Sequence, residues 1–166
     1  MTRPALLTRT LDTPLGAMLL AASPQGLAGA WFCSGQRDTP DTSGWTTAPA
    51  SHPVLSAAAT QLAQYFAGER TAFELPLDLS AGTVFQQRVW RALLALPWGQ
   101  TCSYGALAQQ IGQPQAVRAL GGAVGRNPIS IIVPCHRVLG AKGALTGYSG
   151  GLERKVALLQ REGQSL

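Results

Sequence analysis

Residues 116–138 read AVRALGGAVGRNPISIIVPCHRV and join a short helical pattern to an apolar run that ends in a cysteine. Val117, Leu120 and Val124 keep the spacing of one helical face, which predicts a helix that begins near Gln115. Upstream, residues 104–111 show the pattern of another short helix, ended by a glycine and a proline. Two short helices across such a turn predict a helix-turn-helix, although many helical enzymes contain similar pairs.

The opposite face of the helix near residues 117–125 carries mostly small side chains. It holds Arg118, Ala119, Gly121, Gly122, Gly125 and Arg126. Each glycine inside a helix costs about 1 kcal/mol relative to alanine, so this face needs an explanation. Two interpretations stay open, which are tight packing against another helix and close approach of a bulky partner such as a nucleic-acid groove.

Cys135 lies between Pro134 and His136, with Arg137 behind, and is the strongest candidate nucleophile. A thiol attacks as the thiolate, and a nearby base or positive charge lowers its pKa. In an extended segment, neighbouring side chains point to opposite faces, so His136 needs a bend or a bridging water to serve as a base. Pro134 favours such a bend. The alternative is a buried structural cysteine beside a hydrogen-bonded histidine.

A histidine base works better when a carboxylate orients it, and residues 81–166 offer two glutamates. Glu153 falls in the first turn of a predicted helix, LERKVALLQREG, where it meets the helix dipole favourably. Glu162 falls at the edge of the predicted inward stripe of Leu152, Val156 and Leu159. We therefore expect Glu162 to be half buried with a partner; an exposed glutamate at the helix end is the alternative.

The first third of the chain predicts a small sheet. Three apolar runs, LLTRTL, AMLLAA and LAGAWF, are separated by the turn signals DTPLG and SPQG, which favours an antiparallel meander. A loop over residues 34–50 and a helix from Pro53 to about Gly68 follow. Thr83 and Gln86 have the spacing of a capping box at the start of a further helix. The sequence thus predicts an α+β fold, with an N-terminal domain over residues 1–80 and a mainly helical domain over residues 81–166.

Composition and charge restrict the class of protein. The 166 residues are 46% hydrophobic and 13% charged, as in soluble globular proteins, and no apolar run approaches the roughly 20 residues that span a bilayer. The N-terminus lacks a signal-peptide pattern, which predicts a cytoplasmic location without membrane association. The three cysteines predict neither a disulfide framework nor a zinc site. Residues 1–80 carry a net charge of −2 and residues 81–166 carry +7, so the second half suits a polyanion.

The motifs from about Thr83 to Gly163 resemble the O6-alkylguanine-DNA alkyltransferase family. They are FQQRVW, SYGALA, the quoted stretch and GALTGYSGGLERKVALL. The resemblance implies a small ribonuclease H-like N-terminal domain and a C-terminal domain like a winged helix-turn-helix. It implies single-turnover transfer of the alkyl group from O6-alkylguanine, and from O4-alkylthymine, to the protein, with nucleotide flipping. The implied partner is double-stranded DNA bound without sequence preference, by a monomer that could bind cooperatively, with no cofactor and no metal.

The resemblance also implies a role for each matching residue. Cys135 is the implied alkyl acceptor, His136 its water-mediated base and Glu162 the carboxylate that orients the base. Asn127 is implied to brace the turn between the recognition helix and the active-site strand. Tyr104 is implied to lie beside the rotated phosphate and the guanine ring nitrogen, and Arg118 to replace the flipped nucleotide in the stack. The implied pocket contacts are the carbonyls of Cys135 and Val138 with Tyr148 and Ser149, and the implied DNA-facing surface holds Ala119, Gly121 and Gly122.

Three other functions fit parts of this pattern. A DNA-binding module that marks lesions without removing them would lack the nucleophile, and Cys135 argues against it. A cysteine hydrolase with a Cys-His-Glu triad would turn over repeatedly. A helix-turn-helix regulator with an incidental thiol would bind DNA without any transfer. Mass measurement of the protein after exposure to a lesion-bearing duplex separates all three from the alkyltransferase.

Overall fold

The N-terminal part of the chain forms a four-stranded mixed sheet. The computed structural model describes residues 5–166. In it, β1 (Leu7–Leu11), β2 (Met18–Ser23) and β3 (Gly26–Phe32) pair as an antiparallel meander, as predicted. A short strand, β4 (Thr46–Thr47), pairs parallel to β1 and completes the order β3-β2-β1-β4. The sheet is therefore mixed, and β4 lies within the segment that the sequence predicted to be a loop.

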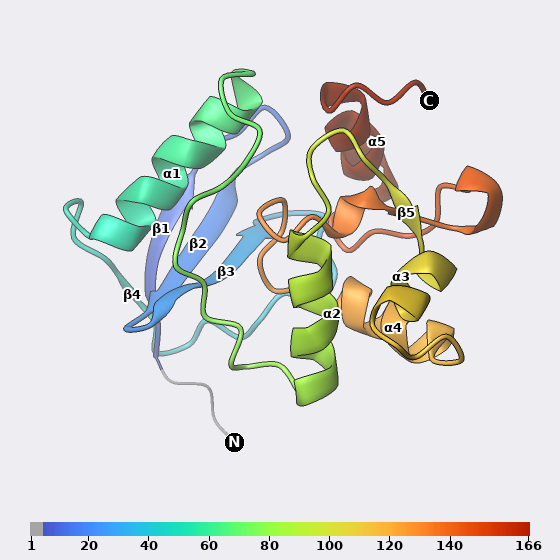
Figure 1. Cartoon of the computed structure of the whole chain (residues 1–166). Helices are drawn as coiled ribbons and strands as arrows, with labels where there is room; N and C mark the ends of the chain where they lie inside the picture. The colour runs from blue at the N-terminus through green and yellow to red at the C-terminus, as the bar shows by residue number, and fades with distance from the viewer. Residues whose placement is uncertain (1–4) are drawn as a thin grey trace.

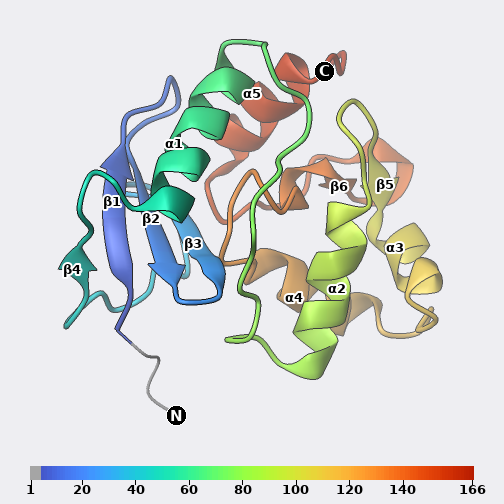
Figure 2. The ribbon, with the colours of Figure 1, turned by 60° about the vertical axis from the view of Figure 1, so that its left-hand side comes forward.

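One long helix, α1 (Pro53–Phe66), covers a face of this sheet (Figures 1 and 2). His52 caps the helix, because its Nδ1 accepts a hydrogen bond from the Leu55 backbone N–H at 3.3 Å. The helix that the sequence predicts from Pro53 is present, and its Leu55, Ala58 and Leu62 form a buried apolar stripe. Gly68 follows with φ +77°, a conformation that glycine adopts without strain.

The C-terminal part is built from four helices around short connections. They are α2 (Val84–Leu94), α3 (Tyr104–Gln110), α4 (Val117–Gly125) and α5 (Leu152–Arg161). The capping box predicted for Thr83 and Gln86 is present at the start of α2. A two-stranded parallel ladder joins β5 (Cys102–Ser103) to β6 (Val138–Leu139), and two single 3₁₀ turns lie at η1 (Cys135–Arg137) and η2 (Ala141–Gly143). The α+β fold class is confirmed.

Two helical faces differ from the sequence prediction. In α4, Leu120 and Val124 are buried, whereas Val117 at the first turn is 38% exposed. In α5 the inward face is rotated: Leu152 is 46% exposed, and the buried positions belong to Lys155, Leu158 and Leu159. Leu159 is buried as predicted, whereas Lys155 takes an inward position that a hydrophobic pattern does not predict, because lysine usually faces water.

A continuous core unites the two parts of the molecule. Buried side chains from the sheet, from α1 and from all four C-terminal helices belong to one apolar cluster. The segment after α4 also pairs with the edge of the sheet, through a parallel bridge between Ala30 of β3 and Ile129. Among residues 5–166, no helix is long and apolar enough to cross a bilayer.

Candidate active site

The segment that carries Cys135 is fastened to the N-terminal sheet. The Ala30 backbone N–H donates to the Pro128 carbonyl at 2.9 Å, and the Ser130 N–H donates to the Ala30 carbonyl at 3.0 Å. Ile131 then has φ +73°, and the Ile132 N–H reaches back to the Ser130 carbonyl at 2.9 Å, which closes a γ-turn. A β-branched residue at positive φ is strained, so this turn depends on the surrounding contacts that hold it.

A second tight turn, at Pro134, aims the cysteine. Pro134 has φ −82° and ψ 62°, and the Cys135 N–H donates to the Val133 carbonyl at 2.8 Å, which makes an inverse γ-turn. The predicted bend is present. The next residues are not extended, however, because Cys135–Arg137 form the 3₁₀ turn η1. Neighbouring side chains in η1 therefore need not point to opposite faces, as an extended segment would require.

The buried Asn127 side chain braces this loop. Its Nδ2 donates to the Val133 carbonyl at 2.7 Å and contacts Cys135 Sγ at 3.1 Å. Its Oδ1 accepts a hydrogen bond from the Ile129 N–H at 2.9 Å. One amide thus satisfies both ends of the turn and places a polar hydrogen against the sulfur.

Glu162, the C-cap of α5, is the centre of a buried polar network. Its Oε2 accepts hydrogen bonds from the Tyr65 hydroxyl at 2.5 Å and Arg137 Nη2 at 3.0 Å, and lies 2.8 Å from His136 Nε2. Its Oε1 accepts from Arg137 Nε at 2.7 Å. Glu162 is 1% exposed, so it is fully buried, more than the half burial predicted from the helix pattern.

The charges of this network can be assigned from its contacts. Burial raises the pKa of Glu162, but the hydrogen bonds from His136 and Arg137 outweigh it and bring the pKa to about 2. Burial lowers the pKa of His136 below its usual value, although its hydrogen bond to Glu162 opposes this. A neutral imidazole beside a carboxylate donates through Nε2. His136 Nδ1 is therefore left as an acceptor, and it is buried without a hydrogen-bond partner among residues 5–166.

Cys135 itself is held as a thiol at neutral pH. It is 5% exposed, and burial raises the pKa of its thiol to about 11, against the opposing effects of the Asn127 amide and the Lys155 ammonium. Arg137 follows closely in the sequence, but its guanidinium turns away to Glu162 and to the Leu96 carbonyl. Reaction at this sulfur requires a base.

A cavity of about 380 Å³ opens beside Cys135. Such a volume lies within the range of small-molecule sites. Its lining combines glycines of α4, three aromatic or hydroxyl side chains and two arginines: Arg37, Asp38, Tyr104, Gly121, Gly122, Val124, Gly125, Arg126, Cys135, Gly147, Tyr148 and Ser149. The site therefore has an open side that could receive a flat polar group and a buried side that holds an acid–base pair.

Comparison with known proteins agrees with this arrangement over nearly the whole chain. Residues 84–164 match the DNA binding domain of 6-O-methylguanine DNA methyltransferase, and residues 6–79 match the ribonuclease-like domain of the same family. The chain is 53% identical to the methylated-DNA–protein-cysteine methyltransferase of Mycobacterium tuberculosis H37Rv over 154 residues, which cover 93% of this chain and 90% of that protein. It is 45% identical to the Methanosarcina acetivorans protein of the same name, covering 92% and 95%. A crystal structure of Mycobacterium tuberculosis OGT in complex with DNA superposes with a TM-score of 0.85 at 52% identity, covering 93% and 91%.

The chain belongs to the 6-O-methylguanine DNA methyltransferase family. In this methyltransferase, several of the predicted site residues share the cavity with Cys135, namely Tyr104, Gly121, Gly122, Tyr148 and Ser149. Four others lie buried behind it, namely Asn127, His136, Val138 and Glu162. Arg118 and Ala119 lie on the exposed face of α4, outside the cavity lining.

Two of the predicted pocket contacts are engaged within this methyltransferase. The Val138 carbonyl accepts a hydrogen bond from Lys155 Nζ at 2.7 Å. The Ser149 hydroxyl donates to the Gly125 carbonyl at the end of α4. A carbonyl oxygen has a second lone pair and a hydroxyl can rotate, so both groups keep the capacity for one contact to a ligand.

The structure decides between the two interpretations of the glycine-rich face of α4. A Cβ atom added at Gly121, Gly122 or Gly125 would meet nothing within 4 Å. Tight packing against another part of the described chain is therefore not the reason for these glycines. The methyltransferase keeps a smooth, open face here, which suits the approach of a partner.

Sequence reasoning missed several residues of the site. Arg37 and Asp38 line the cavity from the loop after β3, and the Arg37 backbone N–H donates to the Ser149 carbonyl at 2.8 Å. Tyr65 reaches Glu162 from α1, 97 residues away along the chain. No local pattern marks such partners. Lys155 carried a possible signal, as a lysine at an inward position of an amphipathic helix.

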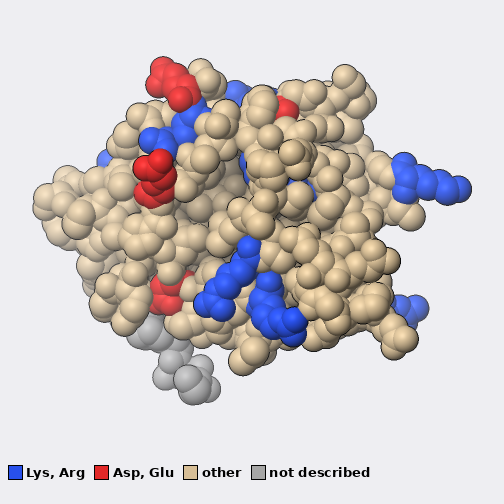
Figure 3. All heavy atoms as spheres, in the orientation of Figure 1, with Lys and Arg blue, Asp and Glu red and all other residues tan. Residues whose placement is uncertain are grey.

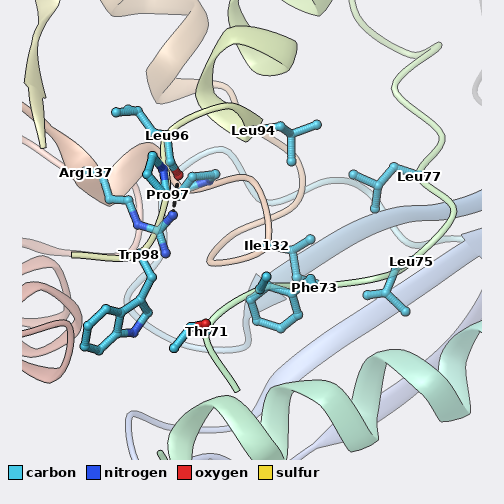
Figure 4. A pocket seen from close by; sticks show the side chains of 12 residues that line it. Thr71, Phe73, Leu75, Leu77, Leu94, Leu96, Pro97, Trp98, Ile132 and Arg137 are labelled. Atoms are coloured by element: carbon cyan, nitrogen blue, oxygen red, sulfur yellow. Dashed lines mark hydrogen bonds between the residues drawn. The ribbon is translucent and has the colours of Figure 1, made fainter. Parts of the chain in front are cut away.

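A second cavity, of about 330 Å³, does not have Cys135 in its lining (Figure 4). Its lining is mainly apolar and comes from the connector after α1, from the end of α2 with the turn that follows, and from the segment 132–137 around Cys135. It includes Phe73, Leu77, Leu94, Trp98 and Ile132. Arg137 borders it with its guanidinium bound to the Leu96 carbonyl at 2.6 Å. The only charged side chain in its lining is thus already engaged.

Acidic and basic side chains are distributed differently on the surface of this methyltransferase. On the face drawn in Figure 3, acidic side chains lie mainly over the N-terminal part, while basic ones are more widely spread. Cys33 is exposed, although cysteine is among the residues most often buried, and Cys102 is half buried. No group of three or more metal-ligating side chains gathers within residues 5–166.

Proposed function

We propose that this protein removes the alkyl group from O6-alkylguanine in double-stranded DNA by transferring it to Cys135 Sγ. The observation that carries this proposal is the position of Cys135 between an open cavity and the buried His136–Glu162 pair. Membership of the methyltransferase family gives the reaction class, and the geometry supports the roles that we propose for individual residues.

Entry of the lesion requires that its nucleotide leave the duplex. The alkyl carbon on guanine O6 is out of reach inside a base stack, and extrusion costs a few kcal/mol. The open face of α4, with Gly121 and Gly122, allows the helix to approach a groove closely. Arg118 is exposed on the same helix and takes the place of the extruded base. Basic side chains of the C-terminal part bind phosphates without reading the sequence.

His136 acts as the base that removes the thiol proton. Its Nε2–H is held by Glu162, so Nδ1 is the free basic nitrogen, and a water molecule carries the proton to it from Cys135. Glu162 remains ionised and stabilises the imidazolium that forms. Tyr65 and Arg137 hold the carboxylate in place from two other directions.

The transfer itself is one displacement. The sulfur forms a bond to the alkyl carbon as the bond from that carbon to guanine O6 breaks, and the electron pair moves onto the guanine. Tyr104 then supplies a proton to the guanine ring nitrogen, since its oxygen can accept from Thr146 Oγ1 at 3.3 Å while its own hydroxyl hydrogen stays free. The proton that His136 took from the thiol returns through water to the Tyr104 oxygen, so that overall a thiol and an alkylguanine become a thioether and guanine. A thioether has no proton to lose, so each molecule acts once.

The test compares Cys135→Ser with Cys33→Ser, a matched control at an exposed thiol. Each protein is incubated with a duplex containing one O6-methylguanine, and its mass and the restored guanine are measured. We expect Cys33→Ser to gain one methyl group and Cys135→Ser to gain none while still binding the duplex. Methyl transfer to Cys135→Ser, or to a peptide without residue 135, would overturn the proposal.

A further inference from the structure

The Arg154 guanidinium, on the first turns of α5, joins three segments that are far apart in the sequence. Its Nε donates to the Leu15 carbonyl, in the turn between β1 and β2, at 3.0 Å. Its Nη1 donates to the Ser34 carbonyl after β3 at 2.7 Å and to the Gly150 carbonyl before α5 at 3.0 Å. Its Cζ lies 4.1 Å from the centroid of the Phe32 ring. One side chain thus connects the N-terminal sheet to the loop that precedes α5.

The geometry of these contacts suits a guanidinium and not an ammonium. A guanidinium presents five N–H donors in a fixed plane, whereas an ammonium directs three donors from one nitrogen. The backbone also comes close to the guanidinium: a Cβ atom at Gly16 would lie 3.0 Å from Arg154 Nη2, and one at Gly35 would lie 3.2 Å from Nη1. A lysine at position 154 would therefore keep the charge without joining the three segments.

The loop that Arg154 holds carries two residues of the cavity beside the sulfur. Gly150 directly follows Tyr148 and Ser149, which both line that cavity. A Cβ atom at Gly150 would lie 2.6 Å from Tyr148 Cε2, so the Tyr148 ring packs directly on the Gly150 backbone. The Ser149 carbonyl accepts a hydrogen bond from the Arg37 N–H, in the loop after β3, at 2.8 Å. The places of both side chains therefore depend on contacts with the N-terminal part of the chain.

We infer that Arg154 is a positioning residue that fixes Tyr148 and Ser149 against the N-terminal sheet, where they form one wall of the site for the alkylated base. This inference rests on the proposed function, because it takes the cavity to be the site of the extruded guanine. Arg154 is not among the residues that line the cavity, so it acts through the loop. Its loss should slow the reaction of bound DNA and leave duplex binding, which we assign to the open face of α4, unchanged.

The same helix offers a matched control in Arg161. Its Cζ lies 5.1 Å from the centroid of the Phe66 ring of α1, and its Nη1 donates to the Phe66 carbonyl at 2.7 Å. Arg161 thus also joins α5 to the N-terminal part through a ring and a carbonyl, but it does not contact the loop before α5. Arg154→Met and Arg161→Met remove the same kind of contact, and only the first releases the loop.

The first measurement needs no DNA and follows the exchange of single backbone amides by NMR. The Arg37 amide reports on the loop, because it is bound to Ser149. We expect it to exchange about tenfold faster in Arg154→Met, as loss of a supporting hydrogen bond of about 1.4 kcal/mol implies, and at the parent's rate in Arg161→Met. The Ala30 amide, which is bound to the segment after α4, should keep its rate in both variants.

The second measurement separates binding from reaction. Single-turnover methyl transfer from an O6-methylguanine duplex is followed over a range of protein concentrations, at a temperature where every variant is folded. We expect Arg154→Met to lower the maximum rate about tenfold, because small misplacements at a reacting centre are costly, with the half-saturating concentration unchanged. Arg154→Lys should be nearly as slow, and Arg161→Met should match the parent protein. If Arg154→Met does not fold, Arg154→Lys carries both predictions.

The outcomes separate this inference from the proposed function. A folded Arg154→Met protein with the parent's maximum rate, or an Arg37 amide that exchanges equally fast in both arginine variants, would overturn the inference. A loss confined to the half-saturating concentration would make Arg154 a residue of duplex binding and would also overturn it. Absence of methyl transfer by the parent protein would instead overturn the proposed function.

Discussion

Two sides of Cys135 are built in opposite ways. Behind it, Glu162 satisfies Tyr65, His136 and Arg137 in a fully buried network that draws on α1, η1 and α5. In front, α4 presents glycines whose added Cβ atoms would touch nothing, beside a cavity open to the surface. The difference teaches that the groups proposed for the chemistry are held in place by burial, whereas the groups proposed to meet the DNA are exposed and make few contacts within the protein.

This comparison makes a general prediction. Substitutions in the buried network behind the sulfur should lower the transfer rate or the stability without changing DNA binding. Substitutions on the open face in front should lower duplex binding or transfer from duplex DNA without destabilising the fold. Each variant below tests one half of that statement, in order of decreasing effect.

The largest effect is expected for His136→Gln, which removes the proposed base. We expect the single-turnover rate of methyl transfer to fall at least about 100-fold, the usual minimum for loss of general-base catalysis. Binding to a lesion-bearing duplex, measured by fluorescence anisotropy, should be unchanged. His52→Gln is the control, since the chain has two histidines and His52 only caps α1. Transfer by His136→Gln at the wild-type rate would contradict the role.

Glu162→Gln should reduce stability by about 3 kcal/mol, because it leaves the buried Arg137 without its counter-charge. The pKa of Glu162 is about 2 in the folded protein against a usual 4.5, so its stabilisation is present above pH 4.5 and is lost as pH falls from 4.5 to 2. In urea unfolding, the difference in unfolding free energy between wild type and Glu162→Gln should therefore become smaller as the pH is lowered from 4.5 to 2. Glu153→Gln, at the exposed first turn of α5, should lose less than about 1 kcal/mol. A gap that does not vary with pH would count against the assigned charge.

In front of the sulfur, Arg118→Ala should slow transfer from duplex DNA by about tenfold. Extruding the nucleotide costs a few kcal/mol, and without the Arg118 side chain in the emptied stack less of that cost is offset. Transfer from a single-stranded oligonucleotide should change much less, since no stack needs filling. Thermal unfolding should shift by less than about 0.5 kcal/mol in free energy, as for other exposed positions. Arg91→Ala, also exposed, is the control. An equal loss on both substrates would remove Arg118 from the flipping step.

The smallest effect sharpens the comparison most, because its two readouts should move in opposite directions. Gly122→Ala should stabilise the protein by up to about 1 kcal/mol, since alanine favours the helix and its methyl group meets open space. The same methyl group should weaken duplex binding a few-fold by holding α4 away from the groove. Gly112→Ala should instead lose stability, because Gly112 has φ +77°. Unchanged duplex affinity for Gly122→Ala would leave the open face of α4 unexplained.

Local patterns sufficed for much of the fold and for the residues named within the motifs. Capping at Thr83, the turn signals between the strands and the Pro134 bend all act within a few residues, and all are present. The failures involve contacts between distant segments. Tyr65 and Arg37 join the site through tertiary packing, and β4 depends on pairing with β1. The burial of Lys155 and the exposure of Leu152 reverse the usual preference of those residues, so a hydrophobic pattern alone predicts neither.

The central claim is that one sulfur takes one alkyl group, and peptide mass after titration tests it most directly. Increasing amounts of a duplex containing O6-methylguanine are added to a fixed amount of protein, and the methylated peptide and restored guanine are both counted. We predict that restored guanine rises to one equivalent of protein and stops, with every methyl group on the peptide that contains Cys135. Restoration beyond one equivalent, or methylation at Cys33 or Cys102 in place of Cys135, would contradict the account.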